Sequence, residues 1–215
     1  MSTPIKRLIA SALAGFAVLF GLVRANASAA FDLAITLKVQ GNRHPAVRRL
    51  LGLASWPGFP PQSRLIPPIV IGTMLARGRR VDGAFQLASW GGALISTVVK
   101  SIVKRPRPLP PQVEVVVAPL GGSSFPSGHV LTYVGFYGFL TYLVATQVED
   151  ETRRHAGVAA LCALLALVGP SRIQQGHHWT TDVVASYLLG LAYLLALVEA
   201  HDLVMTPRSR LPWSR

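Results

Sequence analysis

The sequence predicts an all-α integral membrane protein, a bundle of about six transmembrane helices. Two observations carry this prediction. Hydrophobic residues make up 51% of the 215 residues and charged residues only 14%, whereas soluble domains carry about 25% charged residues. The hydrophobic residues also gather in long runs, which are separated by basic or proline-rich stretches. We therefore expect a single membrane-embedded domain over residues 1–215, with its core at about 60–200.

The net charge of +12 comes from 21 lysines and arginines against 9 acidic residues. The basic residues interrupt apolar runs and do not cluster with aromatic residues on one polar face, which argues against nucleic-acid binding. Anionic lipid headgroups and a phosphorylated substrate explain them better. We expect the bilayer and a lipid phosphate as partners, no nucleic acid and no obligate protein partner. The single cysteine, Cys162, excludes an internal disulfide.

The first apolar run covers residues 8–23 and follows Lys6 and Arg7. It is slightly shorter than the roughly 20 residues that span a bilayer. Small residues at 27–29 follow it, so removal of residues 1–29 as a signal peptide is an alternative. We expect an uncleaved first transmembrane helix, with Arg24 reaching the interface at its far end.

The next segment, residues 31–64, is too polar to span a membrane, and residues 47–53 predict a short helix at the interface. Five further spans follow, at residues 65–76, 83–103, 130–148, 157–168 and 183–198. Pro67 and Pro68 weaken the second span, whereas the small residues of the third allow close helix packing. Residues 104–126 contain six prolines, which predict an extended loop outside the membrane.

Loop charge predicts the orientation, because cytoplasmic loops carry the excess of lysine and arginine. With the N-terminus inside, the cytoplasmic ends hold Lys6, Arg7, Arg77, Arg79, Arg80, Arg153, Arg154, Arg208, Arg210 and Arg215. The opposite side then holds three polar segments, around Arg107, around His129 and at residues 171–182. These segments should meet at the outer face of the membrane, which we expect to be a bacterial inner membrane.

The three segments together contain the groups that a phosphate needs. Lys100, Arg107 and Arg172 supply positive charge, and an arginine fork binds two phosphate oxygens at once. Ser127 and Gly128 stand where a helix begins, and the free N–H groups of a helix start suit an anion. Glycine also lets the backbone approach the ligand closely. The sequence therefore predicts a phosphate site.

Two histidines and a carboxylate are expected to have different catalytic roles. Asp182 follows His178 by four residues, so both share one helix face, whereas His177 points elsewhere. We expect Asp182 to set the tautomer of His178, His178 to attack phosphorus, and His129 to protonate the leaving oxygen. A helix-stabilising pair or two metal ligands are the alternatives for His178 and Asp182. A metal is disfavoured because the nearby cations would repel it, so we expect no metal and no cofactor. His201 is expected to be an interface residue without a role.

These residues resemble the three-part signature of the type 2 phosphatidic acid phosphatase superfamily. The first part is Lys100, six residues, Arg107 and Pro108, and the second is the run at 126–129. The third is Ser171, Arg172, five residues, His178, three residues and Asp182. All eleven positions match, and the resemblance extends over about residues 60–200.

The resemblance implies a bundle of six transmembrane helices, metal-independent hydrolysis of phosphate esters, and a phosphohistidine intermediate. It makes His178 the nucleophile, Asp182 its orienting carboxylate and His129 the acid. It assigns phosphate binding to Lys100, Arg107, Ser127, Gly128 and Arg172. Gln174 and Gln175 replace the aromatic or aliphatic residues expected there, and the sequence does not assign them a role.

The expected activity is hydrolysis of lipid phosphates or diphosphates at the outer membrane face. Substrates of the undecaprenyl diphosphate, phosphatidylglycerol phosphate or phosphatidic acid type all fit, and the sequence does not choose among them. A lipid phosphotransferase is an alternative. A vanadate-dependent haloperoxidase would be soluble and larger. A non-enzymatic lipid-phosphate transporter or binding protein would not need the two histidines and the aspartate, and no inverted repeat supports a transporter.

Overall fold

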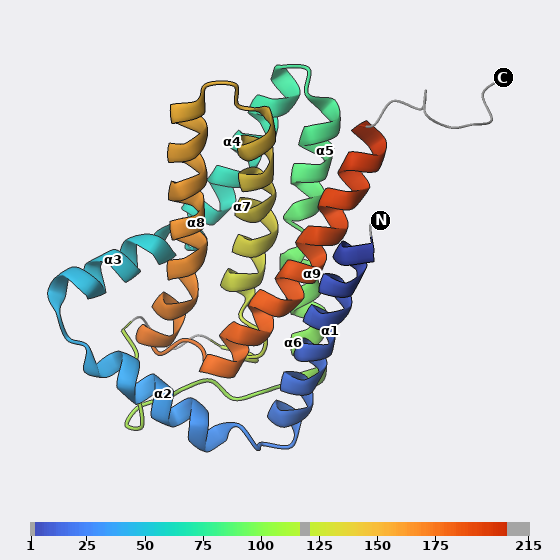
Figure 1. Ribbon diagram of the computed structural model, residues 1–215. Coiled ribbons are helices and arrows are strands. Elements are labelled where there is room, and N and C mark those ends of the chain that lie inside the picture. Colours follow the sequence, from blue (N-terminus) through green and yellow to red (C-terminus); the bar gives the residue numbers. More distant parts are fainter. Residues whose placement is uncertain (1–2, 117–120, 206–215) are drawn as a thin grey trace.

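The computed structural model describes residues 3–116 and 121–205, and over these residues the chain is helical without strands (Figure 1). Its helices are α1 (Thr3–Arg24), α2 (Ala29–Gly41), α3 (Pro45–Ser55), α4 (Gln62–Ala76), α5 (Arg80–Ser89), α6 (Gly92–Val103), α7 (Gly128–Gln147), α8 (Glu151–Gln174) and α9 (Thr180–Met205). A short 3₁₀ turn, η1 (Trp56–Gly58), joins α3 to α4. The all-α fold class is confirmed. The single-domain assignment stays a prediction, and Pro119 and the basic tail at Arg208, Arg210 and Arg215 lie outside the described residues.

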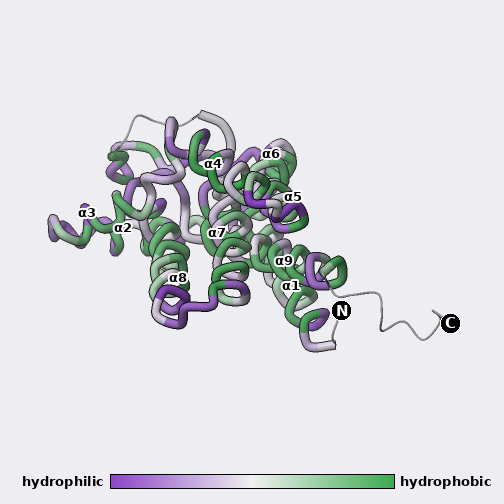
Figure 2. The backbone as a smooth tube through the Cα atoms, turned by 90° about the horizontal axis from the view of Figure 1, so that it is seen from above, coloured by the Kyte–Doolittle hydropathy of each residue, from purple (hydrophilic) through white to green (hydrophobic). Residues whose placement is uncertain are grey.

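Four helices, α1, α7, α8 and α9, are long and apolar enough to cross a membrane. In the view from above, these helices are mostly hydrophobic, while the start of α8 and parts of α3 are hydrophilic (Figure 2). Large apolar side chains such as Val18 and Leu94 are exposed on the outside of the bundle. An outer apolar surface of this kind suits contact with lipid tails, so the protein is an integral membrane protein.

Helix α7 is the most buried of the long helices. Its residues Val130 and Phe136 form a core with Val168 of α8 and Val183 of α9. Small residues make the close packing possible: a Cβ at Gly135 would lie 2.5 Å from the Ser89 carbonyl oxygen of α5. The central position of α7 therefore depends on a glycine where the neighbouring backbone passes.

The predicted span at residues 83–103 is not one helix, and this is a correction. It divides into α5 and α6 at a turn formed by Trp90 and Gly91. The N–H groups of both residues donate to carbonyls three positions earlier, at 3.1 and 2.8 Å, so the regular four-residue spacing ends there. Gly92 then packs closely on α7, where an added Cβ would lie 3.0 Å from the Leu131 carbonyl oxygen. Consecutive glycines weaken the helix and allow this approach.

The N-terminal part also adds to what the pattern predicted. The short helix expected near residues 47–53 is present as α3, but α2 was not predicted. Helix α1 packs lengthwise against α9, and its Phe16 and Phe20 contact the buried ring of Phe125. The first apolar run is therefore part of the bundle in this structure.

The connections fall into two groups at opposite ends of the bundle. The α4–α5 and α7–α8 connections lie at one end (Figure 1). The α1–α2 and α8–α9 connections and the long segment after α6 lie at the other end (Figure 1). All three predicted polar segments are therefore at the same end. The arginine-rich connections at Arg79 and Arg153 are at the opposite end.

His201 was predicted to lie at the membrane interface without a role, but the structure places it inside the bundle. Its side chain is buried, and Nε2 lies 2.8 Å from Oδ1 of Asp82. Asp82 also accepts a hydrogen bond from Arg79 at 2.9 Å. His201 thereby ties α9 to α5 at the end of the bundle opposite the three polar segments.

Candidate active site

The structure brings Arg107 and His178 together. Nη1 of Arg107 lies 3.4 Å from Nε2 of His178 and donates to the His177 carbonyl at 2.7 Å. His178 lies in the connection between α8 and α9, and Nδ1 is 2.8 Å from the Ser124 carbonyl oxygen. The first and third predicted segments therefore meet directly, and the second joins them through Ser124.

The contact with Ser124 determines the tautomer of His178. A carbonyl oxygen can only accept a hydrogen bond, so the proton is on Nδ1 and Nε2 keeps its lone pair. Burial is the main cause that lowers the pKa of His178 well below its usual 6.5, and the charges of Arg172, Arg107 and Lys100 add to it. At neutral pH the ring is therefore uncharged, with Nε2 turned toward Arg107. This is the protonation state that a nucleophilic histidine requires.

The pH dependence follows from that shift. Because proton binding to His178 is disfavoured, Nε2 stays unprotonated as the pH falls through 6.5. The unprotonated, nucleophilic form of His178 is lost only below that pH. We expect the acid limb of kcat/KM, corrected for ionisation of the substrate phosphate, to lie below pH 6.5. Arg107→Gln removes a nearby positive charge and should move the limb to higher pH. Arg48→Gln, which removes an exposed ion pair with Glu114, should leave it in place. A wild-type limb above pH 6.5 would contradict the assignment.

Asp182 lies beside His178 but is held by other groups. Its Oδ1 accepts from Nη1 of Arg105 at 2.6 Å, and its Oδ2 accepts from the backbone N–H of Trp179 at 2.9 Å. Oδ2 is 3.6 Å from Nδ1 of His178, which is longer than a hydrogen bond. The Ser124 carbonyl is the closer acceptor for Nδ1, and Asp182 instead accepts from the Trp179 N–H in the turn that carries His178. Its predicted orienting role stays a prediction.

Arg172 is fully buried and tied to its surroundings. Nη1 donates to Oγ of Ser55 at 2.6 Å and to Oε1 of Gln175 at 2.8 Å. Nη2 contacts His177, and the guanidinium lies 5.0 Å from the centroid of the Phe59 ring. Gln175 therefore has a role that the sequence did not show, because it holds the arginine in place.

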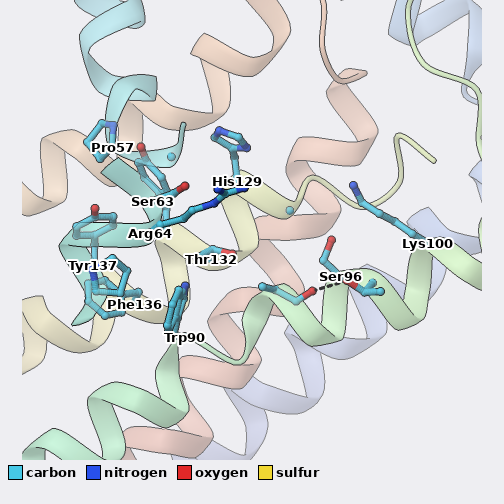
Figure 3. Close-up of a pocket in the computed structure, with 16 residues that line it drawn as sticks. Pro57, Ser63, Arg64, Trp90, Ser96, Lys100, His129, Thr132, Phe136 and Tyr137 are labelled. Atoms are coloured by element: carbon cyan, nitrogen blue, oxygen red, sulfur yellow. Dashed lines mark hydrogen bonds between the residues drawn. The ribbon is translucent and has the colours of Figure 1, made fainter. Parts of the chain in front are cut away.

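Lys100, Gly128 and His129 line a cavity of about 390 Å³ between α4, α6 and α7 (Figure 3). Figure 3 shows Lys100 on one side of this cavity and Arg64 of α4 on the other. Trp90, Phe136 and Tyr137 form part of its wall. The cavity thus has a cationic side chain on each of two sides and aromatic side chains in its wall.

The ring of His129 is closely packed. It lies 5.0 Å from the Phe59 ring, centroid to centroid. A Cβ added to Gly58 would come within 2.3 Å of its Cδ2. A Cβ added to Gly128 would lie 3.2 Å from Oγ of Ser96 and 3.9 Å from Nζ of Lys100. The glycine before His129 therefore lets the backbone pass close to Ser96, with Lys100 beside it.

Several buried polar atoms here have no hydrogen-bond partner among the described residues. They are Oγ of Ser96, Oγ of Ser127, Nε2 of His129 and Nε of Arg172. The backbone N–H of Ser127, in contrast, donates to Oγ of Ser186 at 2.7 Å. Buried polar groups are almost always paired, so a cluster of unpaired ones suits a site that receives a polar ligand.

Comparison with known proteins agrees with this arrangement. The family model of the PAP2 superfamily matches residues 84–205. The chain belongs to the PAP2 superfamily. This stretch holds every signature residue named above, from Lys100 to Asp182. The stretch that the family model matches therefore contains the residues that form the candidate site.

Two curated superfamily relatives are similar in sequence. Phosphatidylglycerophosphatase B of Bacillus subtilis (strain 168) is 29% identical over 194 residues, which cover 87% of this chain and 91% of that protein. Lipid phosphate phosphatase delta of Arabidopsis thaliana is 29% identical over 108 residues, which cover 46% of this chain and 26% of that protein.

Two solved structures share the fold. The transmembrane PAP2 type phosphatidylglycerolphosphate phosphatase from Bacillus subtilis has a TM-score of 0.81 at 23% identity, covering 93% of this chain and 98% of that one. Aquifex aeolicus LpxE has a TM-score of 0.61 at 20% identity, covering 79% and 95%. Both likenesses concern the fold, and the first is to a transmembrane PAP2 protein.

Several residues of the site lie outside the superfamily signature and were missed in the sequence. The Ser124 carbonyl has no side-chain signal at all. Arg105 stands in the run from Arg105 to Pro108 and was passed over for Arg107. Asp32 is a charged residue in an apolar stretch, and this was the signal in the N-terminal part that could have indicated a contribution to the site.

Proposed function

We propose that the protein hydrolyses phosphate or diphosphate esters of membrane lipids, without a metal, through a phosphohistidine formed on His178. One observation carries the proposal: a neutral His178, whose unprotonated Nε2 lies 3.4 Å from Nη1 of Arg107, is at the end of the bundle that also holds Lys100 and His129. The names of the curated relatives support lipid phosphates as the substrate class.

The proposed reaction has two steps. Lys100, Arg107, Arg172 and the first amides of α7 bind the phosphoryl oxygens. Nε2 of His178 then forms a bond to phosphorus while the ester P–O bond breaks, and His129 gives a proton to the departing oxygen. A bound phosphate dianion favours protonation of His129 for this step. Water next attacks the phosphohistidine and gives its proton to His129, so that inorganic phosphate leaves and Nε2 is free again.

The cavity indicates how a lipid would enter. Its cationic end suits the phosphate, and the wall formed by Trp90, Phe136 and Tyr137 suits the glycerol or first isoprene carbons. Arg64 adds a positive charge on the other side. Phosphatidylglycerol phosphate, phosphatidic acid and undecaprenyl diphosphate types all fit this description.

Purified protein in detergent, offered a panel of these three lipids, tests the proposal. We expect phosphate release from at least one of them, unchanged in excess chelator because three cationic side chains already supply the positive charge. Vanadate should inhibit, since it adopts the trigonal-bipyramidal shape of the transition state. Activity that is lost in chelator and restored by a stoichiometric metal would instead identify His178 and Asp182 as metal ligands. Transfer of the phosphoryl group to an added lipid alcohol in preference to water would identify a phosphotransferase instead.

We also propose that the active site faces away from the cytoplasm of a bacterial inner membrane. Labelling in intact cells with a membrane-impermeant thiol reagent tests this, in a Cys162→Ser background because Cys162 is exposed. Gly121→Cys, in the segment before α7, should react in intact cells. Glu151→Cys, at the start of α8, should react only after lysis. Gly121 suits the purpose because a Cβ there meets nothing within 4 Å. Equal labelling of both positions in intact cells would refute the orientation.

A further inference from the structure

A buried network of three charged residues lies behind the candidate nucleophile. Nη2 of Arg105 lies 2.6 Å from Oδ2 of Asp32, and its Nη1 lies 2.6 Å from Oδ1 of Asp182. The exposed fractions of the side chains are 9% for Arg105, 1% for Asp32 and 0% for Asp182. Asp32 belongs to α2 and Arg105 to the segment after α6, and neither is part of the three-part signature. Two carboxylates therefore share one guanidinium, which leaves one net negative charge.

This network also holds the start of α9. Oδ1 of Asp32 accepts from the backbone N–H of Thr181 at 2.8 Å, and Oδ2 accepts from its hydroxyl at 2.7 Å. Asp182 accepts from the backbone N–H of Trp179, and the guanidinium of Arg105 lies 5.8 Å from the Trp179 ring centroid. The first N–H groups of a helix have no acceptor within the helix. The carboxylates of Asp32 and Asp182 provide acceptors for these N–H groups at the start of α9. His178 directly precedes Trp179, and its position depends on how this turn is held.

Charged groups from several elements act near His178. The charges of Lys100 of α6, Arg107 of the following segment and Arg172 of α8 disfavour its protonation, and His129 of α7 interacts with it electrostatically. The carboxylate of Asp182 of α9 lies 3.6 Å from its Nδ1. Only Asp182 is negative, and Arg105 offsets part of its charge. Without Arg105, two buried carboxylates would face each other without compensation, and like charges in that position repel. The guanidinium, with the Trp179 N–H, therefore holds Asp182 in place and offsets part of its charge beside the imidazole.

We propose that Asp32 and Arg105 are positioning residues of the reaction. They hold Asp182 and the turn that carries His178, so that Nε2 is aligned with phosphorus, and they do not contact the substrate. The inference rests on the proposed hydrolysis. It makes α2, outside the stretch that the family model matches, a working part of the active site.

Kinetics of Asp32→Asn and Arg105→Gln test the proposal, with Arg48→Gln as the matched control. Both network variants should lower kcat by about 10- to 100-fold, the range found when a partner that orients a histidine ligand is removed. KM should stay within about twofold, because Lys100, Arg107 and Arg172 are unchanged. The control should match the wild type. A raised KM with unchanged kcat would overturn the proposal.

The pH profile separates positioning from general damage. Arg105→Gln exposes His178 to the full charge of Asp182 and should move the acid limb of kcat/KM to higher pH. Asp32→Asn leaves Arg105 to neutralise Asp182 more completely and should move the limb to lower pH. The double variant restores the net charge of the network, so its limb should return toward the wild type while kcat stays low. Shifts in the same direction for both single variants would contradict the proposal. If Arg105→Gln does not fold, Arg105→Lys keeps the charge without the fork, and it should lower kcat with little movement of the limb.

Anion binding gives a readout that needs no turnover. Inorganic phosphate relies on the cations, whereas vanadate mimics the transition state and also needs an aligned His178. Titration followed by intrinsic tryptophan fluorescence should show unchanged phosphate affinity and vanadate affinity weakened about 10-fold or more in both variants. Equal loss of affinity for both anions would mean that the network only shapes the anion pocket. A wild type that binds vanadate but releases no phosphate would refute the proposed hydrolysis and leave this comparison valid.

Discussion

His178→Ala is expected to abolish phosphate release, with a loss on the order of 10⁴- to 10⁶-fold, as for removal of a nucleophile in other covalent enzymes. The reason is the geometry of Nε2, which is unprotonated because Nδ1 donates to the Ser124 carbonyl at 2.8 Å. Alanine removes the only atom proposed to bond to phosphorus and leaves Lys100 and Arg107 in place. Phosphate release from the purified variant, followed on the best substrate of the panel, measures the loss.

The covalent intermediate provides the sharper readout. Rapid quench of the wild type should trap an acid-labile, base-stable phosphoenzyme, and His178→Ala should not form it. His177→Ala is the matched control, because His177 contacts Arg172 and the Phe59 ring. It should lower the rate by disturbing Arg172 but still form the phosphoenzyme. If His177→Ala loses this species while His178→Ala retains it, the assignment of the nucleophile is wrong.

His129→Ala is expected to slow departure of a lipid alcohol by about 10²- to 10⁴-fold, the usual contribution of a general acid. Nε2 of His129 is buried without a hydrogen-bond partner among the described residues, and the residue lines the same cavity as Lys100. An alkoxide is a poor leaving group and needs the proton from His129. When a lipid diphosphate is cleaved, the leaving group is the lipid monophosphate, which needs that proton less. The loss should therefore be much smaller for undecaprenyl diphosphate than for phosphatidic acid.

The ratio of kcat between these two substrates measures the effect. Thr132→Val is the matched control, because Thr132 lines the same cavity on the same helix and is assigned no proton transfer. It should change both rates equally. If His129→Ala also slows both substrates by the same factor, His129 binds the phosphate rather than protonating the leaving group.

The sequence alone was enough for the fold class and for the superfamily. Composition and long apolar runs indicate a membrane helix bundle because each span needs enough apolar residues in one continuous stretch. The shared helix face predicted for His178 and Asp182 is wrong, because α9 begins only at Thr180 and His178 lies in the turn before it. The 3.6 Å approach of the two side chains therefore comes from that turn and not from helix geometry. Lys100, Arg107 and His129 were recognised because their order and spacing match the superfamily signature. Their presence at one end of the bundle was predicted from a count of six spans. Four of the described helices are long and apolar enough to span, so the count of six stays a prediction.

Tertiary structure decided how these residues are held. The Ser124 carbonyl sets the tautomer of His178, and a backbone acceptor has no side chain by which the sequence could reveal it. Arg172 is fixed by Ser55, which is 117 positions away. Asp32 reaches Thr181 across 149 positions. The division between α5 and α6 depends on how closely α7 approaches Gly92. Such contacts form only when helices pack against one another. Packing joins residues that are far apart in the sequence and have no regular spacing, so the sequence pattern does not reveal them.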